Sequence, residues 1–98
     1  MRIEATAEVT GFIRDRGGRV FVWIQPMAYG SGRVFVLEAS TDSPGPEREF
    51  RRFRTDEGIE VLFDADGRAL PERLLLAVKG WRRKRIRAYW NGNSFAQG

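Results

Sequence analysis

Arginines alternate with aromatic residues late in the chain, between Trp81 and Trp90. Alternate side chains of an extended strand share a face. One face of this segment would therefore carry Trp81, Arg83, Arg85, Arg87 and Tyr89. Arginine binds phosphate through its fork of N–H donors, and aromatic rings stack on bases. This face is predicted to bind single-stranded nucleic acid. The alternative is a solvated strand whose charges keep a sheet edge soluble.

A second patch is predicted on residues 19–25. Arg19, Phe21 and Trp23 would share one face, and the β-branched residues between them would face the core. On the next strand, Arg33 lies in the same kind of position. The alternative is that both faces of these strands are covered and the rings belong to the core.

A third cluster of arginines is interrupted by Phe50 and Phe53. Its members are Arg48, Arg51, Arg52 and Arg54. If the hairpin that carries them packs near the last strand, the two arginine sets merge into one basic stripe. A surface hairpin with its phenylalanines turned inward would show the same pattern.

The chain contains no cysteine and no histidine. A thiolate zinc site, a cysteine nucleophile and the commonest general base are therefore excluded. Two carboxylates such as Asp64 and Asp66 could hold Mg²⁺ in a carboxylate-dependent nuclease. However, Asp64-Ala65-Asp66-Gly67 is also an ordinary turn sequence. We expect no enzymatic activity, no cofactor and no metal.

Length and charge bound the remaining choices. With 98 residues, the chain is predicted to form a single domain over 1–98. The basic excess lies in residues 48–98, which carry twelve cations against seven acids, whereas residues 1–47 carry five against six. Of the 17 cations, 15 are arginine. No signal-like or membrane-spanning apolar run is visible, so we expect a cytoplasmic protein without a membrane partner.

Most of the sequence favours strands. A long alternating strand is predicted over 3–13, bent at Gly11, and a turn at Gly17-Gly18 leads into the next one. A short helix is predicted over 71–79, because Pro71 suits a first helical position and Gly80 a C-terminal cap. The predicted strands cover residues 3–13, 19–25, 33–39, 49–54, 59–63 and 81–90, with loops at 27–32 and 40–47.

This order of elements resembles an oligonucleotide/oligosaccharide-binding (OB) fold. The resemblance rests on the bent first strand, the hairpin through Gly17-Gly18, and the entry from the predicted helix through Gly80 into the basic strand. It implies a small all-β barrel with one short helix in the C-terminal half. It also implies a ligand groove near Arg19, Phe21, Trp23, Arg33 and Phe35, with the loop at Tyr29 closing one end.

The chain departs from that pattern after the third strand. A hairpin over 48–64 intervenes, so the fifth strand is either one of its strands or a very short one near Ser94-Phe95. An SH3-like or Sm-like barrel stays open for the same reason.

Two functions from different classes follow. The first is non-enzymatic binding of single-stranded DNA or RNA with low sequence specificity. The second is a protein-interaction module, or one that self-associates, because open sheets leave edges and exposed tryptophans also mark protein interfaces.

Overall fold

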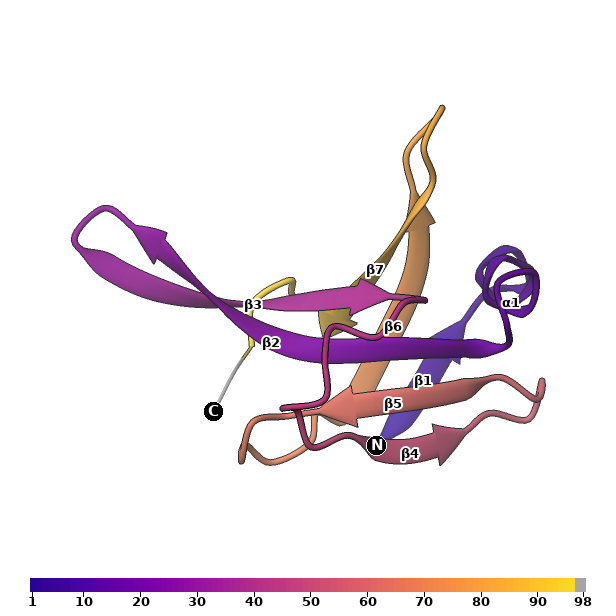
Figure 1. Ribbon diagram of the computed structural model, residues 1–98, viewed down its shortest axis with the longest axis horizontal. Coiled ribbons are helices and arrows are strands. Elements are labelled where there is room, and N and C mark those ends of the chain that lie inside the picture. The colour runs from indigo at the N-terminus through magenta and orange to yellow at the C-terminus, as the bar shows by residue number, and fades with distance from the viewer. Residues whose placement is uncertain (97–98) are drawn as a thin grey trace.

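Two β-sheets and one short helix make up the computed structural model, which describes residues 1–96 (Figure 1). The three-stranded sheet has the order β1-β6-β7, formed by Arg2–Ala5, Arg73–Lys79 and Arg85–Trp90. The four-stranded sheet has the order β3-β2-β5-β4, formed by Gly32–Ser40, Arg19–Tyr29, Glu60–Asp64 and Arg51–Arg54. The expected class, all-β with a single short helix, is confirmed.

The core lies between the two sheets. Fully buried side chains of β2, β5 and β6 belong to one hydrophobic cluster, in which Phe63 contacts Trp90 edge to face with the ring centroids 5.9 Å apart. These sheets do not close into the expected barrel over residues 1–96. Instead, residues 94–96 join them at one corner, where the amide of Leu37 donates to the carbonyl of Ser94 at 2.9 Å.

The single helix is α1, Ala7–Arg14, and not the expected one over 71–79. Thr6 caps it, because its hydroxyl oxygen accepts from the amide of Val9 at 3.3 Å. Val9 and Ile13 are both fully buried. Positions four apart satisfy a period of two as well as a helical turn, so the alternation over 3–13 could not distinguish the two structures.

Residues 73–79 form strand β6, where a helix was predicted. Leu74 and Leu76 are fully buried, while Leu75 and Ala77 lie half-buried on the opposite face. β6 pairs in parallel with β1 and antiparallel with β7, so it is the central strand of its sheet. This pairing outweighs the helix propensity of leucine and alanine, which is a weak preference.

Strand β2 continues past Pro26, where the sequence predicted a stop. Pro26 pairs with Phe35 of β3, whereas the pairing of β2 with β5 ends at Trp23 and Asp64. Proline is tolerated here because only one neighbouring strand is present at this position. The long β2–β3 hairpin therefore extends well beyond the sheet (Figure 1).

Strands β3, β4 and β5 agree with the predicted strands to within about two residues at each end. β4 and β5 form the expected antiparallel hairpin. Near Ser94-Phe95, the other candidate for an additional strand, Phe95 forms only an isolated bridge with Val36. Among residues 1–96, no helix is long and apolar enough to cross a membrane.

Candidate functional site

The β6–β7 hairpin extends away from the rest of the molecule (Figure 1). Its last register pair is Lys79 with Arg85, and the residues between them form the tip. The predicted strand over 81–90 therefore begins only at Arg85. Trp81 and Arg83 lie in the tip and not on the strand face where the sequence placed them.

The predicted facing of the strand itself is confirmed. Ile86, Ala88 and Trp90 point into the core and are at most 6% exposed. Arg85 and Arg87 are exposed on the outer face, where Tyr89 is half-buried. The paired residues of β6 are Lys79 opposite Arg85, Ala77 opposite Arg87, and Leu75 opposite Tyr89.

The outer face of the hairpin is thus an apolar strip with a cationic border. Leu75, Ala77 and Tyr89 form the strip. The sequence predicted a helix over 71–79, so Leu75, Ala77 and Lys79 were not among the predicted binding residues. The uninterrupted apolar run from Leu74 to Val78 is also typical of a strand buried in a sheet, and it was the available signal.

The hairpin has a charge unlike that of the rest of the chain. Residues 73–90 contain seven cations and no acid, whereas the other residues contain ten cations and thirteen acids, a net charge of −3. The seven are Arg73, Lys79, Arg82, Arg83, Lys84, Arg85 and Arg87. Arg73 pairs with Glu4 at 3.2 Å, and none of the other six forms an ion pair with any residue from 1 to 96.

Three arginines of the four-stranded sheet instead form ion pairs within the protein. The carboxylate of Glu60, whose side chain is 13% exposed, forms ion pairs with Arg19 and Arg52 at 3.5 Å and with Arg54 at 3.7 Å. Arg19, one of the predicted site residues, therefore neutralises a carboxylate of its own sheet. This arrangement reduces the charge available to an outside ligand.

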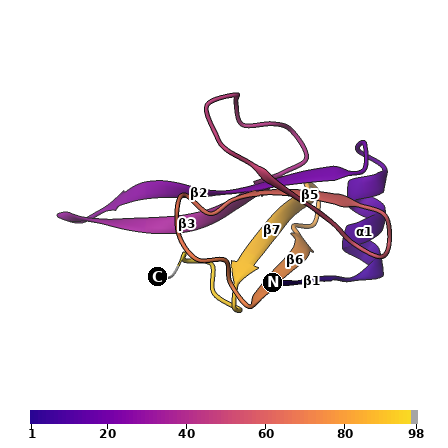
Figure 2. The ribbon, with the colours of Figure 1, turned by 90° about the horizontal axis from the view of Figure 1, so that it is seen from below.

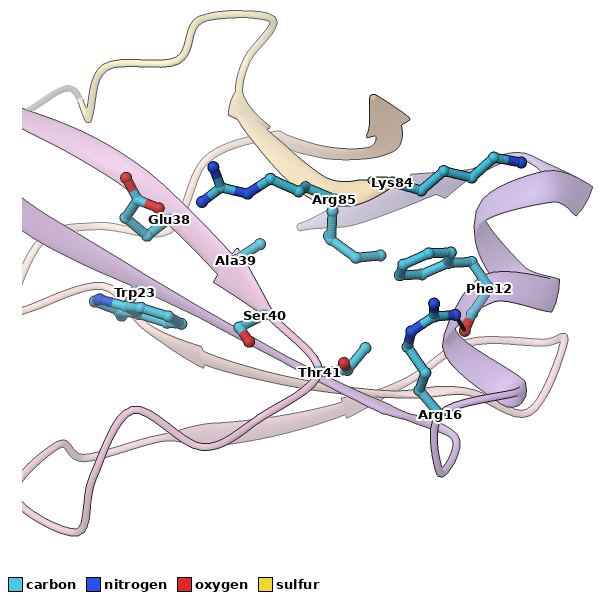
Figure 3. A pocket seen from close by; sticks show the side chains of 10 residues that line it. Phe12, Arg16, Trp23, Glu38, Ala39, Ser40, Thr41, Lys84 and Arg85 are labelled. Atoms are coloured by element: carbon cyan, nitrogen blue, oxygen red, sulfur yellow. Dashed lines mark hydrogen bonds between the residues drawn. The ribbon is translucent and has the colours of Figure 1, made fainter. Parts of the chain in front are cut away.

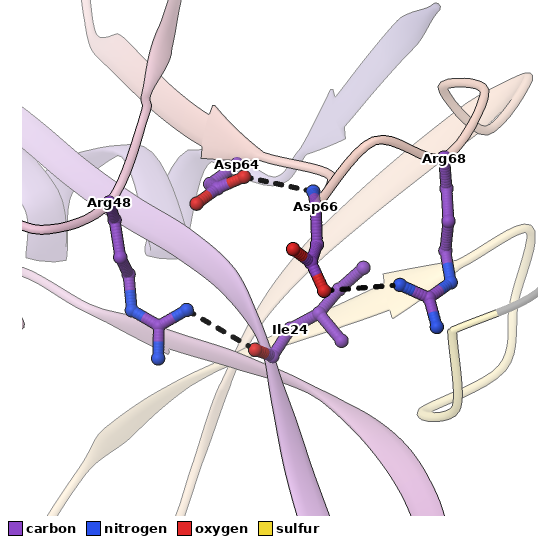
Figure 4. A network of polar contacts seen from close by, with 5 residues as sticks. All are labelled: Ile24, Arg48, Asp64, Asp66 and Arg68. Carbon is purple, nitrogen blue, oxygen red and sulfur yellow. Dashed lines mark hydrogen bonds and ion pairs between the residues drawn. The ribbon is translucent and has the colours of Figure 1, made fainter.

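Two aromatic residues of β2, Phe21 and Trp23, are partly covered from within the chain. The guanidinium of Arg48 lies over the Trp23 ring, 5.6 Å from its centroid, and donates to the carbonyl of Ile24 at 3.3 Å (Figure 4). Phe21 contacts Phe50 edge to face at 5.3 Å. Both partners belong to the segment between β3 and β4, which arches over this sheet face (Figure 2). Phe21 and Trp23 are therefore half-buried.

Tyr29 and Arg33 lie at the end of the β2–β3 hairpin, where Tyr29 is 76% exposed. This end points in a different direction from the β6–β7 tip (Figure 1). The predicted site residues are thus divided among two hairpins and a covered sheet face. The third arginine cluster does not merge with the last strand either, because β4 is the edge of the other sheet.

A cavity of about 320 Å³ opens between α1, the end of β3 and the start of β7 (Figure 3). The guanidinium carbon of Arg16 lies over the Phe12 ring, 3.6 Å from its centroid. Figure 3 shows Lys84 and Arg85 directed to opposite sides, with Glu38 near the end of Arg85. The cavity is therefore a cleft beside the base of the tip, with charges of both signs.

The carboxylates considered as metal ligands take part in a turn. Asp64 accepts the amide of Asp66 at 2.8 Å, and the Asp66 side chain pairs with Arg68 at 3.5 Å (Figure 4). Residues 1–96 hold no group of three or more histidine, cysteine, aspartate or glutamate side chains placed to bind a metal. No known protein family, curated protein or solved structure matches this chain.

Proposed function

We propose that the protein binds single-stranded DNA or RNA, with little sequence preference, on the outer face of the β6–β7 hairpin. The supporting observation is the acid-free segment 73–90, in which six cations have no ionic partner among residues 1–96. Unpaired cations beside an apolar strip suit a ligand that is both charged and aromatic.

Phosphate contacts supply most of the binding free energy in this proposal. Lys79, Arg85 and Arg87 border the strip and neutralise successive phosphates. Each neutralised phosphate releases condensed counterions, so affinity falls as salt rises. Contacts to the backbone carry no sequence information, which accounts for low specificity.

Stacking of bases on aromatic rings supplies the rest of the binding free energy. Tyr89 lies on the strip beside Leu75, where an unstacked base can rest on its ring. Trp81 at the tip is 90% exposed and offers a second ring. Trp23 has no part in this proposal, because Arg48 already occupies its face.

Tryptophan fluorescence during titration with a single-stranded oligonucleotide tests the proposal. Trp90 is 3% exposed and Trp23 is half-buried beneath Arg48, so most of the signal should come from Trp81, which is 90% exposed. We expect saturable quenching at low salt. The plot of log K against log salt should have a slope of about −4 if six cations contact phosphates. Polyglutamate should compete poorly, because it has no bases to stack.

A charge-matched pair of variants locates the interface. Replacing Lys79, Arg85 and Arg87 with Gln removes three charges from the hairpin and should lower affinity at least thirtyfold, or about 2 kcal/mol. Replacing Arg33, Arg51 and Arg54 with Gln removes three charges elsewhere and should change affinity less than about threefold.

Equal losses in the two triple variants would contradict the assignment of this face. No oligonucleotide binding at low salt, together with a dimer in light scattering, would instead support a self-associating module. The exposed Met27 and Tyr29 of the β2–β3 hairpin would then be the first residues to test as its interface.

A further inference from the structure

The tip of the β6–β7 hairpin is built around one glycine. Gly80 has φ of +106°, and a Cβ at this position would overlap the carbonyl oxygen of Arg83. Only glycine fits such a close approach without displacing the backbone. The turn places Trp81 at the end of the hairpin, where the side chain is 90% exposed. A large ring held this far from the core is available to an outside partner.

Charge surrounds the tip on both faces of the ribbon. Lys79 and Arg85 form the register pair on the outer side. Arg82 and Lys84 line a groove of about 540 Å³ on the side toward α1, which Glu8 and Asp15 also line. A flat single strand contacts one face only, whereas a duplex presents two phosphate backbones.

Toward the base of the hairpin, the exposed surface changes from cationic on both faces to an apolar strip on the outer face alone. From Arg87 to Tyr89, only the outer face is open, because Ile86, Ala88 and Trp90 are in the core. That part carries the apolar strip suited to unpaired bases. The tip and the strip belong to the same two strands, and Arg85 to Tyr89 spans about 13 Å at the rise of a β-strand.

We infer that the preferred ligand is a duplex that continues as a single strand. Trp81 stacks on the last base pair, and the cations of the tip contact the two backbones of the duplex. The unpaired strand then runs along the outer face past Arg85 and Arg87 to Tyr89. This inference rests on the proposed function, since it specifies which nucleic-acid form the same hairpin binds.

Fluorescence anisotropy with three labelled DNAs tests it. The probes are a single strand, a blunt duplex, and the same duplex with a single-stranded overhang, each arm about 12 nucleotides long. We expect the overhang probe to bind at least tenfold more tightly than either of the others. Trp81→Ala should lower affinity for both probes, but about tenfold more for the overhang probe than for the single strand, because the terminal base pair stacks on this ring.

Two further variants separate stacking from folding. Trp81→Phe keeps a ring at the tip and should retain the preference for the overhang. Tyr29→Ala removes the exposed ring of the other hairpin and should change no affinity. Circular dichroism of each variant should match that of the parent protein, because both rings are exposed.

Equal affinity for the three DNAs would overturn the inference, as would an equal loss for the single strand and the overhang probe in Trp81→Ala. Salt-dependent binding in either case would leave the proposed function standing. Absence of binding to every probe at low salt would overturn both.

Discussion

Two β-hairpins extend from the core, and they differ mainly in charge. The β2–β3 hairpin, residues 19–40, carries Arg19, Arg33 and Glu38, a net charge of +1. The β6–β7 hairpin, residues 73–90, carries +7. Each has a glycine turn and an exposed aromatic residue at its end, Tyr29 in one and Trp81 in the other. Similar backbones therefore present different chemistry to the solvent.

This difference shows that an arginine's surroundings matter more than its presence. Arg19 lies beside Glu60, and Arg48 lies over Trp23. Both are components of the folded structure. The cations of the β6–β7 tip have no such partners among residues 1–96, so a ligand need not displace an existing contact to reach them.

Charge reversal at one arginine of each hairpin should give the largest difference between the two hairpins, measured as loss of oligonucleotide affinity. Arg85→Glu and Arg33→Glu each lower the net charge by two at an exposed strand position. We expect Arg85→Glu to weaken oligonucleotide binding by about 2 kcal/mol, or about thirtyfold, because it replaces a phosphate contact with repulsion. Arg33→Glu should weaken binding less than about threefold. Anisotropy at low salt measures both, and a similar loss in both would break the comparison.

Replacing the turn glycine of each hairpin with alanine should lower the free energy of unfolding by different amounts. Gly30 has φ of +60° and open space around it, whereas a Cβ at Gly80 would overlap a backbone carbonyl. Gly80→Ala should therefore cost about 1 kcal/mol more than Gly30→Ala in urea unfolding. Equal costs would mean that the β6–β7 tip rearranges freely and does not hold Trp81 in place.

Removing the carboxylate of Glu60, which pairs with three arginines, should have the smallest effect on the free energy of unfolding. Glu60→Gln should lower the free energy of unfolding by about 0.5–1 kcal/mol, because the arginines are more than half exposed and solvent screens their charges. The exposed Glu57→Gln is the control and should leave stability unchanged. If Glu60→Gln also increased oligonucleotide affinity strongly, the released arginines would be a second binding face.

Local patterns predicted several elements correctly. The β-branched residues Val20, Val22 and Ile24 were assigned to the core, and they are at most 2% exposed. The β4–β5 hairpin and the inward face of β7 were also predicted. In each case, alternation was clear over several residues and a turn sequence marked the end. Such signals depend only on neighbouring residues.

Two elements were exchanged because their local signals were ambiguous. Residues 7–14 alternate like a strand but form a helix, since Val9 and Ile13 also lie one helical turn apart. Residues 73–79 read as a helix but form the centre of a sheet. Only pairing with β1, which lies about 70 residues earlier in the chain, could decide this.

By itself, the sequence determined an all-β class with one helix, the absence of thiol and imidazole chemistry, and a run of cations without acids. Only the tertiary structure decided which cations of the chain already have a partner within the protein. Glu60 and the Trp23 ring hold arginines from distant parts of the chain, whereas six of the seven cations of the β6–β7 hairpin form no ion pair with any residue from 1 to 96. Charge is a property of composition, but its availability depends on contacts between residues far apart in sequence.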